Sequence, residues 1–285
     1  MLYLIASIIS STTIYVIFRI AKNYSCKLSQ LITINYLTAT LFGFSLMMRF
    51  NLRPIHEGIQ WIPFAVCLGI LFIAMFYLIG LSSQKAGITV TTLANKLSLV
   101  FPVFFSLIWF NETVTAYKYI GLATAIAAVI ATLYKKDLKK VKMPAIILPL
   151  VIFIGSGFTD SFFKYIQATQ LSAIDTGSFS TIVFLVSFIC GTVLLFTRPG
   201  HMLSKLTTST FLLGILLGMV NFGSLYFFIN ALNKSGLGSS LIFTINNLLI
   251  VALSAAAGHF IFREQMNRVN LAGFILAFIS MYILI

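Results

Sequence analysis

The sequence has few charged residues, and acidic residues are the scarcest among them. Only 9% of the 285 residues are charged, with 6 Asp and Glu against 19 Lys and Arg. A soluble domain of this length would carry roughly a quarter charged residues, so this chain could not build a polar coat in water. The shortage argues against a soluble globular protein and makes lipid the expected solvent.

Residues that catalyse reactions or bind metals are also scarce. The sequence has 3 Cys and 3 His, and their wide spacing matches no redox, zinc or metalloprotease motif. It contains no Gly-x-x-x-x-Gly-Lys-Ser/Thr loop, which speaks against ATP hydrolysis. We therefore expect no metal site, no cofactor and no enzymatic activity.

Long apolar runs follow one another from end to end. Hydrophobic residues make up 59% of the sequence, and each run is long enough to cross about 30 Å of hydrocarbon. The runs are apolar throughout, whereas the strands of a membrane barrel would alternate, so we predict helices. The expected fold is an all-α integral membrane protein with ten transmembrane helices, at 2–20, 29–48, 59–82, 88–109, 114–134, 144–170, 174–197, 208–232, 237–261 and 266–285.

The chain divides into two similar halves. A basic linker at 135–143 separates a first five-helix repeat, 1–134, from a second, 144–285. Because five is odd, the second repeat enters the membrane from the opposite side, and such inverted repeats are typical of secondary transporters. The aligned pairs include Tyr77 with Tyr226, Lys85 with Lys234, Gly87 with Gly236, Glu112 with Glu264, and Gly121 with Gly273.

The net charge of +13 would suggest a nucleic-acid partner in a soluble protein. In a membrane protein, Lys and Arg in the loops set the topology instead, so we expect no nucleic-acid partner. With the predicted spans, one face carries 13 Lys and Arg, and the other carries 4, namely Arg49, Arg53, Lys118 and Lys234. This bias places the first face in the cytoplasm and both termini outside.

The aligned motifs read WFNETVTAYKYIGLATAIAAVI and FIFREQMNRVNLAGFILAFISM. With Pro102 in the fourth span, they make the chain resemble the EamA-type members of the drug/metabolite transporter superfamily. Val251 stands where the second half would repeat this proline. The resemblance implies ten helices in two inverted halves, secondary transport in the inner membrane of a bacterium, and termini in the cytoplasm. On this last point it disagrees with the charge bias.

Three ionisable residues lie inside predicted spans. Lys96 is in the fourth span, and Asp160 and Lys164 are in the sixth. Such residues are unfavourable in a membrane and are functional candidates by default. The i, i+4 spacing lets Asp160 pair with Lys164, which leaves Lys96 for a substrate carboxylate or phosphate. Alternatively, Asp160 pairs with Lys96 as a gate or a proton-linked switch, or the lysines extend to the membrane surface.

Neutral polar residues lie at similar depths in other predicted spans. We predict that Asn95, Asn246, Asn247, Thr159 and Tyr15 line the same substrate site as the three ionisable residues. The alternative is that these side chains bond neighbouring helices. Pro102 should kink the fourth span. Glu112 and Glu264 are expected to complement the dipole of the helix that follows each of them.

These observations predict a secondary transporter that moves a small polar metabolite by alternating access. The resemblance favours export of an amino acid or a related compound. Exchange of organic acids or sugar phosphates and a non-transporting scaffold or sensor are the alternatives. The expected partners are a small-molecule substrate and the lipid bilayer, with protons as a candidate coupling ion and either a monomer or a homodimer.

Overall fold

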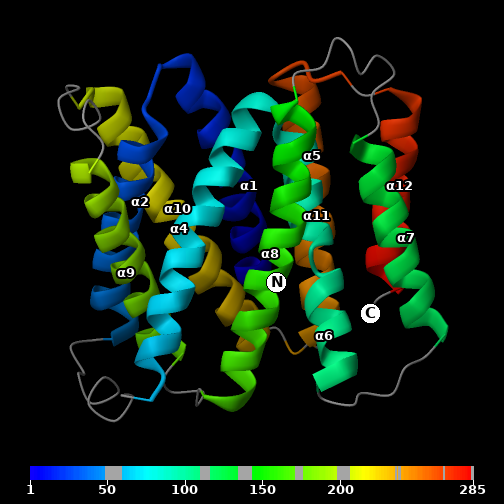
Figure 1. The fold of residues 1–285 in the computed structure, drawn as a ribbon, viewed down its shortest axis with the longest axis horizontal. Coiled ribbons are helices and arrows are strands. Elements are labelled where there is room, and N and C mark those ends of the chain that lie inside the picture. The colour runs from blue at the N-terminus through cyan, green and yellow to red at the C-terminus, as the bar shows by residue number, and fades with distance from the viewer. Residues whose placement is uncertain are drawn as a thin grey trace. The chain divides into compact units, whose positions relative to one another are not determined.

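The computed structural model describes residues 1–48, 60–109, 116–133, 143–170, 176–197, 206–234, 236, 239–265 and 267–283. Within these ranges the chain is helical and contains no strand, so the predicted all-α class is confirmed (Figure 1). The elements are α1 (Leu2–Asn23), α2 (Leu28–Phe42), the π-helix η1 (Gly43–Met48), α4 (Ile62–Lys85), α5 (Ile88–Leu97), α6 (Val100–Trp109), α7 (Ala116–Leu133), α8 (Pro144–Thr169), α9 (Thr176–Thr197), α10 (Thr208–Lys234), α11 (Ser239–Phe260) and α12 (Arg268–Ile283).

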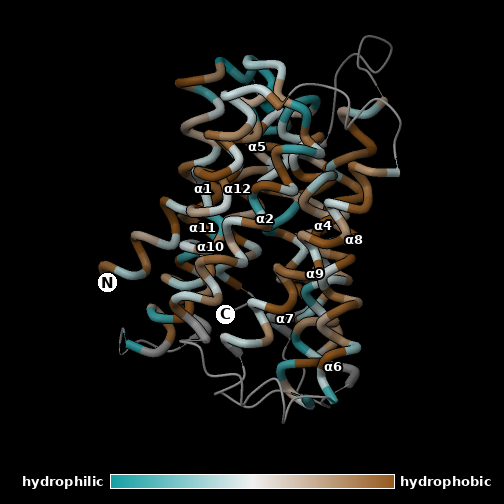
Figure 2. The backbone as a smooth tube through the Cα atoms, turned by 90° about the vertical axis from the view of Figure 1, so that its left-hand side faces the viewer, coloured by the Kyte–Doolittle hydropathy of each residue, from teal (hydrophilic) through white to brown (hydrophobic). Residues whose placement is uncertain are grey.

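Most described helices are apolar along their length, as Figure 2 shows. Six helical segments are long and apolar enough to cross a membrane: Leu2–Asn23, Ile62–Lys85, Ile88–Phe105, Pro144–Thr169, Gly177–Thr197 and Thr208–Leu232. Shorter apolar helices occupy Tyr119–Thr132, Ile245–Phe260 and Arg268–Ile283. The chain is therefore an integral membrane protein of helical type. The number of ten transmembrane helices stays a prediction.

The chain forms two compact units that do not coincide with the predicted repeats. Unit 1 comprises 1–19, 79–161 and 224–285, and unit 2 comprises 20–78 and 162–223. Each unit takes helices from both halves of the sequence. Corresponding helices are distributed alike: α2 and α9 belong to unit 2, α7 and α12 belong to unit 1, and α1, α4, α8 and α10 are divided. This distribution is what two related halves would give, although the repeat itself stays a prediction.

Unit 1 has a core of small and medium apolar side chains. Gly273 of α12 allows close contact with α7, because an added Cβ would lie 2.7 Å from the backbone nitrogen of Thr132. The Asn270 amide strengthens this contact by donating hydrogen bonds to the carbonyls of Ala131 (3.2 Å) and Thr132 (2.8 Å). The buried members of the core are Leu93, Ala94, Leu97, Val100, Ala125, Ala128, Val129, Phe153, Val251, Ala277 and Met281.

Unit 2 is organised around aromatic residues and close helix contacts. Trp61 packs edge-on against Phe179 at 5.6 Å between ring centroids. Gly69 of α4 lies against α9, where the Ser187 hydroxyl donates to the Gly69 carbonyl at 2.8 Å. Small residues that permit such approach are characteristic of helix packing in membranes. The other buried members of this core are Ala65, Leu68, Ile166 and Val183.

The predicted fourth span is divided into two helices, α5 and α6, by a break directly after Leu97. Pro102 has no N–H to donate to the carbonyl of Ser98, and its ring would clash with this carbonyl in a continuous helix. Instead, the N–H of Phe101 donates to the Ser98 carbonyl over a shorter turn at 2.9 Å. In the second half α11 runs unbroken from Ser239 to Phe260, with Val251 at the equivalent position. The sequence predicted a kink at Pro102, and the structure shows a two-residue turn at Ser98 and Leu99, closer to Lys96, between α5 and α6.

Candidate functional site

The N-terminus of α5 is held by the carboxylate of Glu264. The N–H groups of Ile88 and Thr89 donate to its two oxygens at 2.6 and 3.1 Å, and the Thr89 hydroxyl donates at 2.9 Å. These bonds satisfy groups that a helix N-terminus leaves unpaired and place a negative charge at its positive end. Glu264 thus complements the dipole of α5. The sequence had led us to expect that it would complement the dipole of the helix that follows it. Glu112 lies outside the described residues.

A glycine and an arginine shape the turn between α4 and α5. Gly87 has a φ of +105°, and an added Cβ would lie 2.7 Å from Glu264 Oε1. At the end of α4, the Arg19 guanidinium donates to the carbonyls of Ser83 (3.3 Å) and Gln84 (2.7 Å). A positive charge is favourable at a helix C-terminus. Arg19 and Glu264 therefore stabilise the two helix ends that meet at this turn, and α5 is fixed at its start.

Asn95 and Tyr15, both predicted for the site, are joined by a hydrogen bond. The Asn95 amide, on the last turns of α5, donates to the Tyr15 hydroxyl of α1 at 2.6 Å. Tyr15 is buried, and Asn95 is partly buried. Polar side chains within apolar helices are expected to find such partners. This bond connects α1 to α5 one residue before Lys96.

Ser98 bridges the broken helix to α8. Its hydroxyl lies within hydrogen-bond distance of the Asn95 carbonyl, which the break deprives of its usual helical donor. The same hydroxyl lies 3.3 Å from Oδ2 of Asp160. Ser98 is fully buried, so it contacts protein groups on all sides. Sequence reasoning missed this residue, although a hydroxyl located two residues after Lys96 and four before Pro102 was a visible signal.

Lys96 and Asp160 form the charged part of the site. Lys96 is in the last turn of α5 and is partly buried, whereas the Asp160 side chain is exposed. Unit 1 contains four of the predicted residues, Tyr15, Asn95, Lys96 and Asp160. Lys164, one turn farther along α8, belongs to unit 2.

The remaining predicted residues are Asn246, Thr159 and Asn247, and the first two make hydrogen bonds to groups of helices. Asn246 Oδ1 lies 3.2 Å from the Ser7 hydroxyl, which connects α11 to α1. The Thr159 hydroxyl donates to the Gly155 carbonyl of its own helix at 2.8 Å. Asn247 is partly buried. For Asn246 the structure contains a hydrogen bond between helices. The sequence had left this role open as an alternative to substrate binding.

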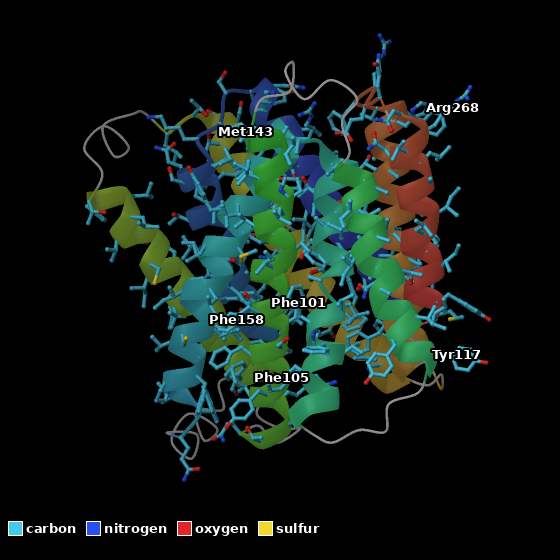
Figure 3. All side chains as sticks on the ribbon, turned by 45° about the vertical axis from the view of Figure 1, so that its right-hand side comes forward. Phe101, Phe105, Tyr117, Met143, Phe158 and Arg268 are labelled. Atoms are coloured by element: carbon cyan, nitrogen blue, oxygen red, sulfur yellow. The ribbon has the colours of Figure 1, made fainter. Side chains whose placement is uncertain are left out.

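Close packing of α6 against α8 supports the site on the C-terminal side of the break. Gly157 lies against the ring of Phe101, so that any Cβ at this position would overlap the ring. Figure 3 labels Phe101 on its own helix, α6. Phe101 also packs edge-on against Phe153, with 5.1 Å between ring centroids. Gly157 is one helical turn before Asp160. The contact therefore fixes the first turn of α6 relative to the carboxylate that Ser98 contacts.

Two buried hydroxyls extend the polar surfaces of α1 and α5. Thr12 lies three residues before Tyr15, and Thr92 lies three residues before Asn95, so each shares a helix face with its polar neighbour. Neither hydroxyl has a hydrogen-bond partner among the residues that the structure describes. Buried polar groups are normally paired.

Comparison with known proteins adds a fold but no activity. No protein-family model matches the chain. A protein from Haemophilus influenzae, described as uncharacterized, is 26% identical over 292 residues, covering 99% of this chain and 96% of the relative. A protein of known crystal structure is similar with a TM-score of 0.53 and 12% identity, over 97% of each chain. At this identity the likeness shows the fold alone, and the function has to be argued from the site.

Proposed function

We propose that the protein is a secondary transporter that moves a small polar metabolite, an amino acid or a related compound, outward across a bacterial inner membrane by alternating access. The observation that carries this proposal is the break between α5 and α6, which begins one residue after Lys96 and whose Ser98 hydroxyl lies 3.3 Å from Asp160 Oδ2. Broken helices at the membrane midplane form the substrate sites of many secondary transporters. Ionisable residues inside the membrane commonly mark such pathways.

Each residue of the site then has a role in substrate binding. The Lys96 ammonium binds the substrate carboxylate, and the Asp160 carboxylate binds a substrate ammonium. The Asn95 amide and Tyr15 hydroxyl, already bonded to each other at 2.6 Å, orient the substrate between these charges.

The proposal includes ten transmembrane helices in two inverted repeats, in line with the resemblance to EamA-type transporters. The alternatives are exchange of anionic metabolites, for which Lys96 would bind a carboxylate or phosphate, and a non-transporting scaffold or sensor. An anionic substrate would leave the charge of Asp160 without a partner. The presence of both charges in unit 1 therefore favours a substrate that carries both an anionic and a cationic group.

A ligand-binding measurement tests the proposal. Purified protein is heated in the presence of amino acids, organic acids, sugar phosphates and nucleotide sugars, and the melting temperature is compared with that of Lys96→Ala. A ligand that binds the folded state alone at about 100 times its Kd stabilises the protein by about 2.7 kcal/mol. We expect an amino acid to raise the Tm of the wild-type protein and not that of Lys96→Ala.

The control is Lys85→Ala, which removes an exposed lysine at the end of α4 and should leave the ligand response unchanged. Stabilisation by sugar phosphates or organic acids instead would select the exchange alternative. Equal stabilisation of Lys96→Ala would contradict a substrate site at the α5–α6 break. The absence of stabilisation by any of these classes would favour a scaffold or sensor.

A further inference from the structure

A hollow of about 560 Å³ lies at the turn between α11 and α12, and the residues that line it are His259, Arg263, Glu264 and Gln265. The turn belongs to unit 1 and lies at the end of this unit where α5 begins (Figure 1). Both oxygens of the Glu264 carboxylate are already bonded to the N-terminus of α5. The hollow therefore offers a ligand the hydrogen-bond donors of its other three side chains, one of which is always positively charged.

Arg263 has a backbone conformation that a glycine would adopt with less strain. Its φ of +53° lies in the left-handed region, which is unfavourable for residues with a Cβ. The Phe262 N–H donates to the Ala257 carbonyl at 3.2 Å, and the Glu264 N–H donates to the Gly258 carbonyl at 2.9 Å, so the chain turns sharply around Arg263. Glycine is the usual residue at such a helix end. An arginine here loses backbone stability but supplies a cation to the hollow.

Exposed apolar side chains lie directly beside the hollow. Phe260 is 80% exposed and Ile261 is 64% exposed. The Phe260 ring packs edge-on against the His259 ring, with 5.0 Å between centroids, so apolar surface begins where the polar lining ends. The predicted topology places this end of α11 on the face with 13 Lys and Arg residues. Basic pockets on the cytoplasmic side of membrane proteins bind the head groups of anionic lipids.

We propose that the hollow at the α11–α12 turn binds the phosphate of an anionic phospholipid, whose acyl chains lie along Phe260 and Ile261. The guanidinium of Arg263 matches two phosphate oxygens at once, and His259 and Gln265 provide further donors. A free phosphate ion would use the same donors, but it would make no use of the apolar surface beside them. The proposal does not depend on the transporter function.

The experiment measures the melting temperature of the full chain in detergent while phosphatidylglycerol or phosphatidylcholine is added. A ligand that binds the folded state raises the Tm, so the titration gives an apparent Kd. We expect stabilisation by phosphatidylglycerol and not by phosphatidylcholine. Arg263→Gly should weaken the apparent Kd about fivefold or more, the effect of one basic residue on binding to anionic lipid. Its Tm without lipid should stay close to that of the wild type, because glycine fits the left-handed conformation.

The matched control is Arg268→Gln, which removes the same charge from an exposed residue at the start of α12, labelled in Figure 3, outside the lining of the hollow. It should keep most of the response to phosphatidylglycerol. Equal weakening by Arg263→Gly and Arg268→Gln would show a general effect of surface charge and overturn the site. Absence of stabilisation of the wild type by phosphatidylglycerol would also overturn it.

Inorganic phosphate separates the two sources of the same chemistry. We expect phosphate alone to raise the Tm much less than phosphatidylglycerol does, because it lacks the acyl chains. Ile261→Ser should weaken the response to phosphatidylglycerol and leave the response to phosphate unchanged. If phosphate stabilises the protein as much as phosphatidylglycerol does, and Arg263→Gly abolishes both effects, the hollow binds a free anion and the lipid proposal is wrong.

Discussion

Replacing Glu264 with alanine is expected to lower the free energy of unfolding by about 2–3 kcal/mol, because the α5 N-terminus loses its charged cap and a set of charge-assisted hydrogen bonds. The N–H groups of Ile88 and Thr89 would then have no carboxylate to bond. Thermal or denaturant unfolding of the purified protein in detergent measures the loss. Amide hydrogen exchange at Ile88 and Thr89 should become faster at the same time.

The control for this prediction is Gln265→Ala, which alters the exposed neighbouring residue and should leave stability nearly unchanged. Glu264→Gln should fall between the two, since one amide oxygen still accepts a hydrogen bond but the negative charge is lost. Because α5 carries Asn95 and Lys96, we also expect Glu264→Ala to weaken ligand binding. Unchanged exchange at both amides would show that the cap does not stabilise α5.

Replacing Gly157 with leucine is expected to destabilise the protein by about 3 kcal/mol, the upper part of the range for overpacked interiors. No Cβ fits at this position without overlapping the Phe101 ring, and the backbone of α8 cannot retreat without moving Asp160. Unfolding measurements provide the stability change. The expected decrease should be accompanied by a loss of ligand binding, because the contact sets the distance between α6 and α8.

A second-site variant makes the Gly157 prediction specific. Phe101→Ala removes the ring that the new side chain would meet, so the combination with Gly157→Leu should be more stable than Gly157→Leu alone. Ile154→Phe is the control for added bulk on α8, because Ile154 is 51% exposed and has room for a larger side chain. Equal destabilisation by Ile154→Phe would place the effect in α8 itself and not in its contact with Phe101.

Much of the fold was predictable because lipid imposes simple rules. Apolar runs of membrane-spanning length must be helices, and this reasoning identified the all-α class and the segments around α1, α4, α8, α9 and α10. The division into units was not predictable. It depends on which helices of the two halves pack together, and no local pattern encodes this choice.

Within the site, the sequence identified residues better than it identified their partners. Polar side chains in apolar spans are few, so Tyr15, Asn95, Lys96 and Asp160 were visible as candidates. Glu264 was visible too, but its partner Ile88 lies 176 residues away in the chain, and spacing cannot reveal such a contact. Arg19 was counted as a loop charge for the same reason, although it binds the end of α4.

The break after Leu97 shows the limit of a local rule. Pro102 predicts a distortion of the helix near its own position, and the distortion is present. Its extent toward Lys96 depends on Ser98, whose hydroxyl satisfies the Asn95 carbonyl and contacts Asp160 of another helix. The sequence therefore predicted that the fourth span is bent, but only the tertiary contacts explain where the first helix ends.

Pro102 and Val251 give the proposed carrier a preferred orientation at rest. Two identical inverted halves would exchange roles between the inward-open and outward-open states, so the two states would have equal free energies. A helix that is broken in one half and continuous in the other removes this degeneracy. Pro102→Val makes the halves more alike, and spin-label distance measurements should then show more equal populations of the two states. With a free-energy gap of a few kcal/mol, the resting protein would be almost entirely in one state, so substrate added on one side of the membrane would meet an open site far more often than substrate added on the other.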